Sequence, residues 1–461
     1  MTNQFDLAIV GNGIIGCLAA IRLSSPPYNR KVVLIGPKNR SGSASVAAGA
    51  MLNVFGEIDY VDAEQAYVRR KLEIGQKSIT KWCEFLKHHR ITDNILVADK
   101  TIVYLKPDAT ELETGCFEAI KLASMKAGTF RDQTSAITHL RRSMKIGKSC
   151  QFLQLEKEMA LSTPMLFDWF DQAFRRSENI TLLDTKANSI QPQKSSFVVS
   201  TKLNQVKADK VICAAGSFTK NILGDLGNSM MPLLFGVGTA MQVTSESHLI
   251  TDLLPDRSVV RTPNRGSTCG IHLVPRSKNS FYLGAGSYLS RVPYEGHRMA
   301  TLKYLIDCLE EDFSGQLDKS LVSPQLGYRP VALDGKPMLG PLSENPGIYV
   351  ATGTKRDGLT YAPLIVDDME LWLSGQALLD DFIGWEPDRK PISYGTREFS
   401  AQAYVDNKMA GLLEHNSISS ADVSRVEEEL RLESNKFHNK ISSMFGLEAN
   451  FGVHPEVLNI F

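Results

Sequence analysis

Apolar residues gather in short runs near the start of the chain. Residues 7–10 form one run, residues 14–23 form a longer one directly after a glycine-rich turn, and residues 31–35 form a third. Short apolar runs bounded by turn residues are typical of buried strands, and the longer run is typical of a helix. The pattern predicts a strand, a helix and a second strand.

The same reasoning extends along the chain. Residues 231–288 alternate apolar and polar side chains between turn residues, which predicts an antiparallel sheet, whereas residues 91–148 read as largely irregular. The other predicted helices cover residues 63–87, 118–125, 166–176 and 358–373, and the other predicted strands cover 101–105, 180–183, 197–201, 208–213 and 348–352.

One further amphipathic helix is predicted near the C-terminus. Asp422 marks its start and Gly446 its end. We expect its apolar face to pack on the rest of the chain, and contact with a second copy is the alternative. The face consists of Val426, Leu430, Phe437, Ile441 and Phe445.

Composition excludes several classes of protein. Of 461 residues, 43% are hydrophobic and 22% charged, and the formal net charge is zero. A chain without a basic field does not indicate binding to nucleic acid or to an anionic membrane. No apolar run is long enough for a membrane span. The seven cysteines are scattered without C-x-x-C spacing, so neither a disulfide framework nor a metal site is predicted, and we expect a cytoplasmic protein without a signal peptide.

The turn after the first strand has the pattern G-x-G-x-x-G, formed by Gly11, Gly13 and Gly16. In a dinucleotide-binding fold the first glycine permits the turn, the second lets a pyrophosphate approach the backbone, and the third lets the helix pack on the strand. The helix N-terminus then offers N–H groups to the phosphates. A tight turn without a ligand is the alternative.

The second predicted strand ends at Gly36, where a dinucleotide fold usually has Asp or Glu for the ribose. Backbone or water would then hold the ribose, or Lys38 and Arg40 would hold a more anionic group such as that of NADP. On this reasoning Gly36→Glu should be tolerated, because it restores the missing acceptor.

Two stretches of small residues, 41–53 and 214–217, would let the backbone pass close to a flat ligand. The alternatives are a flexible loop for the first and an ordinary strand end for the second. A later glycine motif, residues 348–363, predicts a strand, a turn at Gly353 and a helix whose N-terminus is a second anion site.

Six motifs in this order resemble the FAD-dependent D-amino-acid-oxidase-like superfamily, in particular its glycine oxidase and sarcosine oxidase branch. They are residues 11–16, 41–53, 214–216, 273–276, 327–330 together with 334–337, and 352–363. The resemblance implies a mixed α/β fold, in which a Rossmann-like FAD-binding domain (1–90, 150–225 and 325–375) is interleaved with an antiparallel-sheet substrate domain (91–149 and 226–324). A helical C-terminal extension (376–461) follows.

The resemblance also implies a set of residues around FAD. The 353–360 turn would face the flavin, and Ala187 would contact the adenine through its backbone. The full set is Gly11, Gly13, Ile14, Ile15, Gly16, Ser43, Ser45, Ala48, Gly49, Met51, Ala187, Ala215, Gly216, Gly353, Arg356, Asp357, Gly358, Leu359 and Thr360.

Three further positions are implied on the substrate side. Arg329 lies where related enzymes bind the substrate carboxylate, His272 replaces a tyrosine that assists, and Lys355 stands beside the flavin. A planar guanidinium suits a carboxylate. The alternatives are a structural salt bridge for Arg329, a core histidine for His272 and a surface lysine for Lys355.

The resemblance implies an enzyme that oxidises the C–N bond of a small amine or amino acid. Hydride would pass to flavin N5, giving an imine that hydrolyses, and oxygen or a quinone or carrier would reoxidise the cofactor. The alternatives are a 2-hydroxy-acid dehydrogenase and a flavoprotein partner without turnover. A homo-oligomer is compatible with these expectations.

Overall fold

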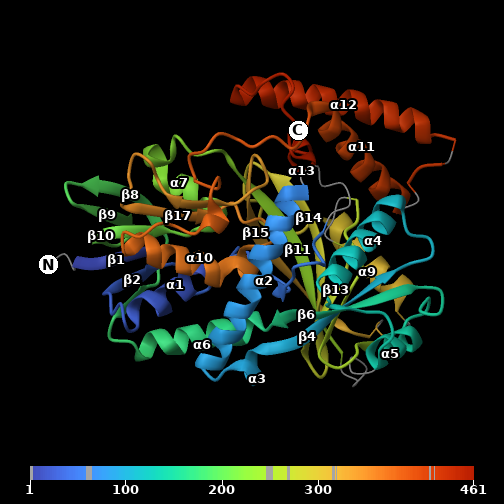
Figure 1. The fold of residues 1–461 in the computed structure, drawn as a ribbon, viewed down its shortest axis with the longest axis horizontal. Helices are drawn as coiled ribbons and strands as arrows, with labels where there is room; N and C mark the ends of the chain where they lie inside the picture. The colour runs from blue at the N-terminus through green and yellow to red at the C-terminus, as the bar shows by residue number, and fades with distance from the viewer. Residues whose placement is uncertain are drawn as a thin grey trace.

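The computed structural model describes residues 4–58, 65–245, 253–266, 270–313, 317, 319–414, 417–419 and 421–460. Two sheets lie side by side, with helices packed around them and a pair of C-terminal helices at the top of the view in Figure 1. The predicted helix start at residue 63 and one cysteine, Cys269, lie outside the described residues, and the six described cysteines are free.

The first sheet has eight strands and contains the N-terminal strand at its centre. The path runs β16-β17-β10-β1-β2-β7, with β17 to β7 parallel and β16 antiparallel at one edge. The strands are β1 (Gln4–Val10), β2 (Val32–Ile35), β7 (Ile180–Leu183), β8 (Ala187–Gln193), β9 (Ser196–Thr201), β10 (Gln205–Cys213), β16 (Met338–Pro341) and β17 (Ile348–Thr352).

The second sheet has nine strands, in the order β15-β11-β14-β13-β12-β4-β6-β3, with β5 beside β6. Its pairs are antiparallel except β12 with β4. The strands are β3 (Met51–Leu52), β4 (Leu96–Leu105), β5 (Phe130–Arg131), β6 (Gln151–Leu161), β11 (Leu233–Thr244), β12 (Ser258–Arg261), β13 (His272–Ser277), β14 (Ser280–Ser290) and β15 (Leu321–Ala332).

No helix in the described ranges has the length and apolar character to cross a membrane. The helices are α1 (Ile14–Ser24), α2 (Gln65–His88), α3 (Thr92–Ile95), α4 (Glu111–Lys126), α5 (Ser135–Ser143), α6 (Thr163–Arg176), α7 (Thr219–Leu223), α9 (Met299–Asp312), α10 (Gly358–Leu373), α11 (Arg397–Glu414), α12 (Val423–Phe445) and α13 (Pro455–Leu458), with 3-10 turns at Gly216–Phe218, Gly224–Gly227 and Asp380–Phe382.

The predicted strand 101–105 lies in β4 and the predicted helix 118–125 lies in α4, but the expectation that the rest of residues 91–148 is irregular is wrong. This stretch holds α3, β4, α4, β5 and α5. Helix α4 begins with a capping box in which Thr110 and Glu113 satisfy each other's backbone N–H groups. Such local signals define the helix start without strong apolar periodicity, which explains why hydrophobic spacing alone placed the start of this helix at residue 118 and not at Glu111.

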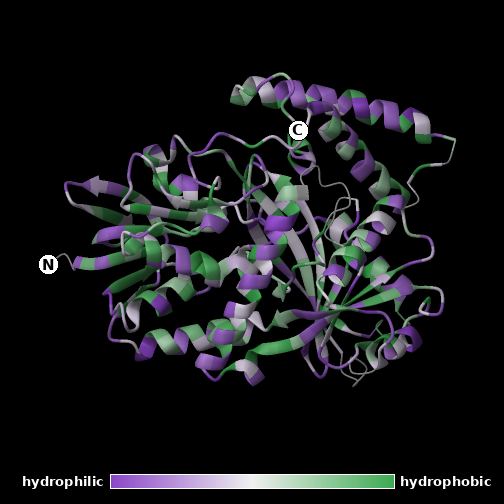
Figure 2. Cartoon of the chain, viewed as in Figure 1, coloured by the Kyte–Doolittle hydropathy of each residue, from purple (hydrophilic) through white to green (hydrophobic). Residues whose placement is uncertain are grey.

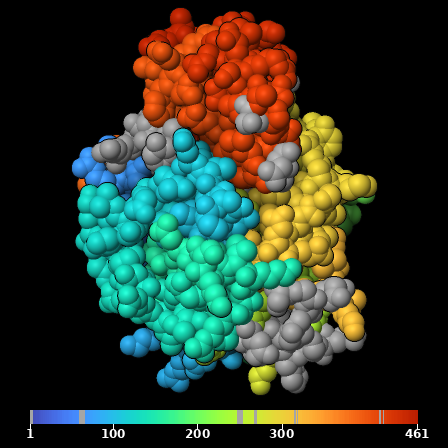
Figure 3. Space-filling view, turned by 90° about the vertical axis from the view of Figure 1, so that its right-hand side faces the viewer, coloured from blue at the N-terminus to red at the C-terminus, as the bar shows by residue number. Residues whose placement is uncertain are grey.

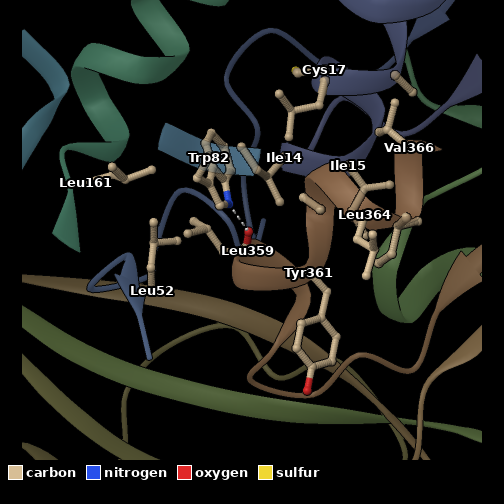
Figure 4. Close-up of a cluster of buried hydrophobic side chains, with 14 of the residues drawn as sticks. Ile14, Ile15, Cys17, Leu52, Trp82, Leu161, Leu359, Tyr361, Leu364 and Val366 are labelled. Atoms are coloured by element: carbon tan, nitrogen blue, oxygen red, sulfur yellow. Dashed lines mark hydrogen bonds between the residues drawn. The ribbon is translucent and has the colours of Figure 1, made fainter. Parts of the chain in front are cut away.

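The core beneath the cofactor motif joins α1, α2 and α10. Helix α1 is buried along almost all of its length. Trp82 of α2 is fully buried and donates from its indole to the Leu359 carbonyl at 2.9 Å (Figure 4). This contact ties the first turn of α10 to a helix that is distant in sequence.

The C-terminal helices belong to the body of the protein. Tyr404, Ile441 and Leu458 are buried in the same cluster as residues of β1 and β10. Figure 2 shows α12 as largely hydrophilic on its outer side. The prediction that the apolar face of α12 packs on the rest of the chain is confirmed.

Candidate active site

A cavity of about 1020 Å³ lies where residues of the two sheets meet. The first sheet contributes the ends of β1, β10 and β17, and the second contributes His272, Tyr282 and Arg329. This volume is at the upper end of the range for small-molecule sites, so the cavity has room for a dinucleotide and a small substrate.

The glycine turn forms one wall. Gly11 has φ +110°, and a Cβ there would lie 2.3 Å from the Ala214 carbonyl oxygen. Gly16 lies behind the wall, where a Cβ would be 1.9 Å from the Gly11 oxygen. Only glycine fits either position, as the motif predicts.

Gly13 faces two hydroxyl groups across the cavity. A Cβ on Gly13 would lie 3.2 Å from Ser45 Oγ and 4.0 Å from Ser43 Oγ. Helix α1 has no acidic residue in its first turn, and its first N–H, that of Ile14, donates to Ser45 Oγ at 3.1 Å. A helix N-terminus without a carboxylate, flanked by hydroxyl groups that can also donate to an anion, suits a pyrophosphate, so these residues fit a dinucleotide.

The expectation that Gly36→Glu is tolerated is wrong. A Cβ on Gly36 would lie 2.4 Å from Cγ of Asn12, whose side chain donates to the Pro37 carbonyl at 2.9 Å. Arg40 is also committed, because its guanidinium pairs with Asp171 and stacks on Phe167. The guanidinium of Arg40 is therefore not free to hold the extra phosphate of NADP.

The stretch of small residues after Arg40 is packed against the second sheet, which disfavours the flexible loop. The Ala47 carbonyl accepts from the Tyr282 hydroxyl at 2.9 Å, and the Ala48 carbonyl accepts from Arg276 at 3.0 Å. Three non-glycine residues of the cavity wall, Arg40, Ala50 and Lys355, have positive φ. Strained backbone of this kind concentrates at functional sites.

The cavity wall includes the three residues assigned to the substrate side. Arg329 lies on β15, and its Nε is buried with no partner among the described residues. Among the residues that the structure describes, Arg329 forms no ion pair. This disfavours the alternative in which Arg329 serves only as one half of a structural salt bridge. Lys355 is only 16% exposed and pairs with Glu456 at 3.0 Å, so it is not a solvated surface lysine.

His272 lines the cavity and is 4% exposed. Its ring stacks on Tyr282 with 5.7 Å between centroids. Burial, together with the charge of Arg261, lowers its pKa to about 3. The imidazole is therefore neutral at physiological pH and offers hydrogen bonds rather than charge.

Buried ion pairs lie close enough to His272 to act on its charge. Glu57 pairs with Arg261 at 2.8 Å and with Arg356 at 3.4 Å. Burial alone would raise the pKa of Glu57. The positive charges of Arg261 and Arg356 outweigh burial and lower this pKa to about 2. Burial raises the pKa of Asp357, which lies 3.4 Å from Lys71.

The structure brings nearly all of the sequence-predicted residues to this one cavity; Gly16 and Gly353 lie outside its lining. Gly353 has φ +69° and turns the chain against the backbone of Lys336 and Met338. The residues at the wall are Gly11, Gly13, Ile14, Ile15, Ser43, Ser45, Ala48, Gly49, Met51, Ala187, Ala215, Gly216, His272, Arg329, Lys355, Arg356, Asp357, Gly358, Leu359 and Thr360.

Sequence reasoning missed several residues that shape the site. Asn12, Glu57 and Tyr282 line the cavity, and Glu456 pairs with two lining cations. The absence of an acidic residue at Gly36 was the available signal for Asn12, because the Asn12 side chain fills the space beside Gly36. Glu456 gives no local signal, because its partners lie far away in the sequence.

The comparisons with known proteins agree with this geometry. A family model described as FAD dependent oxidoreductase (DAO) matches residues 6–367. Glycine oxidase of Geobacillus kaustophilus (strain HTA426) is 25% identical over 384 residues, which cover 79% of this chain and 91% of that protein.

Solved structures share the fold. The structure of glycine oxidase from Geobacillus kaustophilus has a TM-score of 0.70 at 20% identity, covering 84% of this chain and all of the other. Iminodiacetate oxidase from Chelativorans sp. BNC1 has a TM-score of 0.65 at 16% identity, with coverages of 83% and 98%. L-alpha-glycerophosphate oxidase from Mycoplasma pneumoniae, with FAD bound, has a TM-score of 0.61 at 16% identity, with coverages of 85% and 99%.

The mixed α/β fold, the glycine-lined cavity and the family match over residues 6–367 lead to one conclusion: the chain belongs to the DAO family of FAD-dependent oxidoreductases and is an enzyme with FAD as its cofactor.

Proposed function

We propose that this enzyme oxidises the C–N bond of a small amino acid or of an amine that carries a carboxylate. The observation that carries the proposal is Arg329, whose guanidinium lines the cavity and whose buried Nε has no partner in the described ranges. A buried, unpartnered donor on a charged side chain calls for an acceptor from a ligand. A carboxylate is the ligand group that fits a guanidinium best.

The chain's own residues then bind and orient the substrate. Arg329 holds the carboxylate, and neutral His272 and Tyr282 close the wall beside it. The flavin of FAD supplies the two-electron acceptor when it is bound. No protein base is needed if the amine enters uncharged, and the similarity to glycine oxidase and the fold shared with iminodiacetate oxidase support a small amine substrate.

The test is anaerobic flavin reduction with a panel of amino acids, amines and 2-hydroxy acids. In Arg329→Ala we expect the reduction rate constant divided by the apparent Kd to fall by about 30- to 1000-fold, the equivalent of roughly 2–4 kcal/mol, because one charge-assisted contact is lost. Arg329→Lys should recover only part of it, since an ammonium does not reproduce the planar fork. FAD content should remain near that of the unmodified protein.

Arg291→Ala is the matched control, because this exposed arginine lies just after β14 and does not line the cavity. Reduction by 2-hydroxy acids alone would contradict C–N oxidation. Unchanged reduction in Arg329→Ala would contradict the carboxylate assignment.

A further inference from the structure

The C-terminal segment reaches the cavity wall through Glu456. This residue lies on α13, outside the range that the family model matches. Its carboxylate is 3.0 Å from Lys355 Nζ and 3.4 Å from Arg356, and both cations line the cavity. A part of the chain that the family model does not match therefore supplies a charge to the site.

The carboxylate is held in place by its surroundings. Val457 and Leu458, which follow it, are fully buried. The backbone N–H of Glu456 donates to His454 at 3.2 Å, and the His454 ring packs against Gly335, where a Cβ would come within 2.6 Å. Glu456 itself remains 37% exposed, so its charge faces open space as well as its partners.

Glu456 balances a cluster of positive charge. The backbone N–H of Lys355 donates to the Pro330 carbonyl at 2.9 Å, which ties the backbone of Lys355 to the residue that follows Arg329. Arg329, Lys355 and Arg356 thus all line the cavity, and the backbone joins two of them closely. Burial alone would raise the pKa of Glu456. The positive charges of Lys355 and Arg356 outweigh burial and hold this pKa well below its usual range, so Glu456 is ionised at every physiological pH.

We propose that Glu456 is a specificity-determining residue that restricts the cavity to ligands with a single carboxylate. By occupying Lys355 and Arg356 it leaves Arg329 to bind one anionic group, and its own charge repels a second one. This inference rests on the proposed role of Arg329 as the carboxylate site.

The experiment uses the FAD-loaded enzyme and three unreactive acids. Acetate carries one carboxylate, and malonate and succinate carry two at different spacings. The Kd of each is measured from the change it causes in the flavin absorbance spectrum. In Glu456→Gln we expect the Kd of at least one diacid to fall about tenfold relative to that of acetate, as one charge-assisted contact becomes available.

Two further variants make the result specific. Glu448→Gln removes a charge from an exposed position of the same segment and should leave all three Kd values unchanged. Lys355→Met combined with Glu456→Gln should cancel the gain, because the freed ammonium is gone. Thermal unfolding of each variant shows whether the segment still packs.

The outcomes separate the two proposals. The role of Glu456 is overturned if Glu456→Gln lowers the Kd of neither diacid relative to the Kd of acetate. A gain that survives Lys355→Met overturns it too. If Arg329→Ala leaves the Kd of acetate unchanged, the carboxylate site itself is misplaced, whatever Glu456→Gln shows.

Discussion

Asn12 shows how one side chain changes the meaning of a motif. It occupies the variable position between Gly11 and Gly13 and fills the space over Gly36. The strand end therefore lacks an acid because the neighbouring turn leaves no room for one. Any side chain at Gly36 must displace Asn12.

Gly36→Glu should accordingly destabilise the protein by about 1–3 kcal/mol, the usual cost of forcing extra atoms into a packed site. Urea unfolding with FAD content measured in parallel tests this. Asn12→Gly in the same chain should recover much of the loss, because it removes the atoms that lie 2.4 Å from the new Cβ. A stable single variant with full FAD would contradict the steric argument.

His272 also predicts a dependence of stability on pH. Its pKa is lowered from 6.5 to about 3 in the folded protein. Between these values the unfolded chain binds a proton that the folded chain does not, so stability falls as the pH drops below about 6.5. The slope from this one group approaches 1.4 kcal/mol per pH unit.

His272→Gln should therefore make the free energy of unfolding depend less steeply on pH between pH 6.5 and about pH 5. The upper limit is the ordinary pKa of a histidine. Above the lower limit, carboxylates with ordinary pKa values stay ionised and do not contribute to the slope. Denaturant titrations at several pH values give the slope. An identical slope in both proteins would mean that His272 is protonated in the folded state.

At the scale of elements, the sequence predicted most of the first sheet and both glycine turns. Buried parallel strands such as β1 and β10 are continuous apolar runs, and the glycine positions are fixed by steric contact. Helix α11, α3, β5 and α5 were missed, because their apolar residues follow tertiary neighbours rather than a clear period, whereas β4 and α4 were predicted in part. The pairing of β12 with β4 joins distant segments and leaves no local pattern.

The C-terminal elements are joined by a buried polar cluster. Ser400 of α11 is fully buried and lies 3.0 Å from Nε2 of His438 on α12. Its hydroxyl also bonds the Val453 carbonyl, just before the segment that carries Glu456. One hydroxyl thus connects two helices to the tail.

Ser400→Ala should cost about 1–3 kcal/mol, because two buried polar partners lose a hydrogen bond. Hydrogen exchange followed by mass spectrometry should show faster exchange in residues 450–460 and unchanged exchange in α1. Ser443→Ala, at an exposed position of α12, is the control. Unchanged exchange in the tail would show that apolar packing alone holds it.

At the scale of the whole molecule, the C-terminal region is a structural part of the enzyme. Figure 3 shows it stacked on the chain segments drawn in cyan and yellow. The C-terminal region contacts residues 6–367, the range that the family model matches, through both polar and apolar groups. Arg389 pairs with Asp334, which is fully buried in this pair, and the Trp385 carbonyl accepts from Leu339 N–H at 2.7 Å.

A chain that ends at Glu448 tests this integration, because it keeps α11 and α12 but removes the tail. Val453, Val457 and Leu458 are each at most 1% exposed in the complete protein. Fully burying one such side chain contributes about 1.5–3 kcal/mol, so their loss is comparable to the whole stability of many domains. We expect the shortened chain to unfold at a much lower temperature and to lose FAD on dilution. A shortened chain with unchanged thermal unfolding and FAD content would show that the tail only lies on the surface. If it were stable but bound malonate more tightly, the tail would contribute Glu456 to the site without supporting the fold.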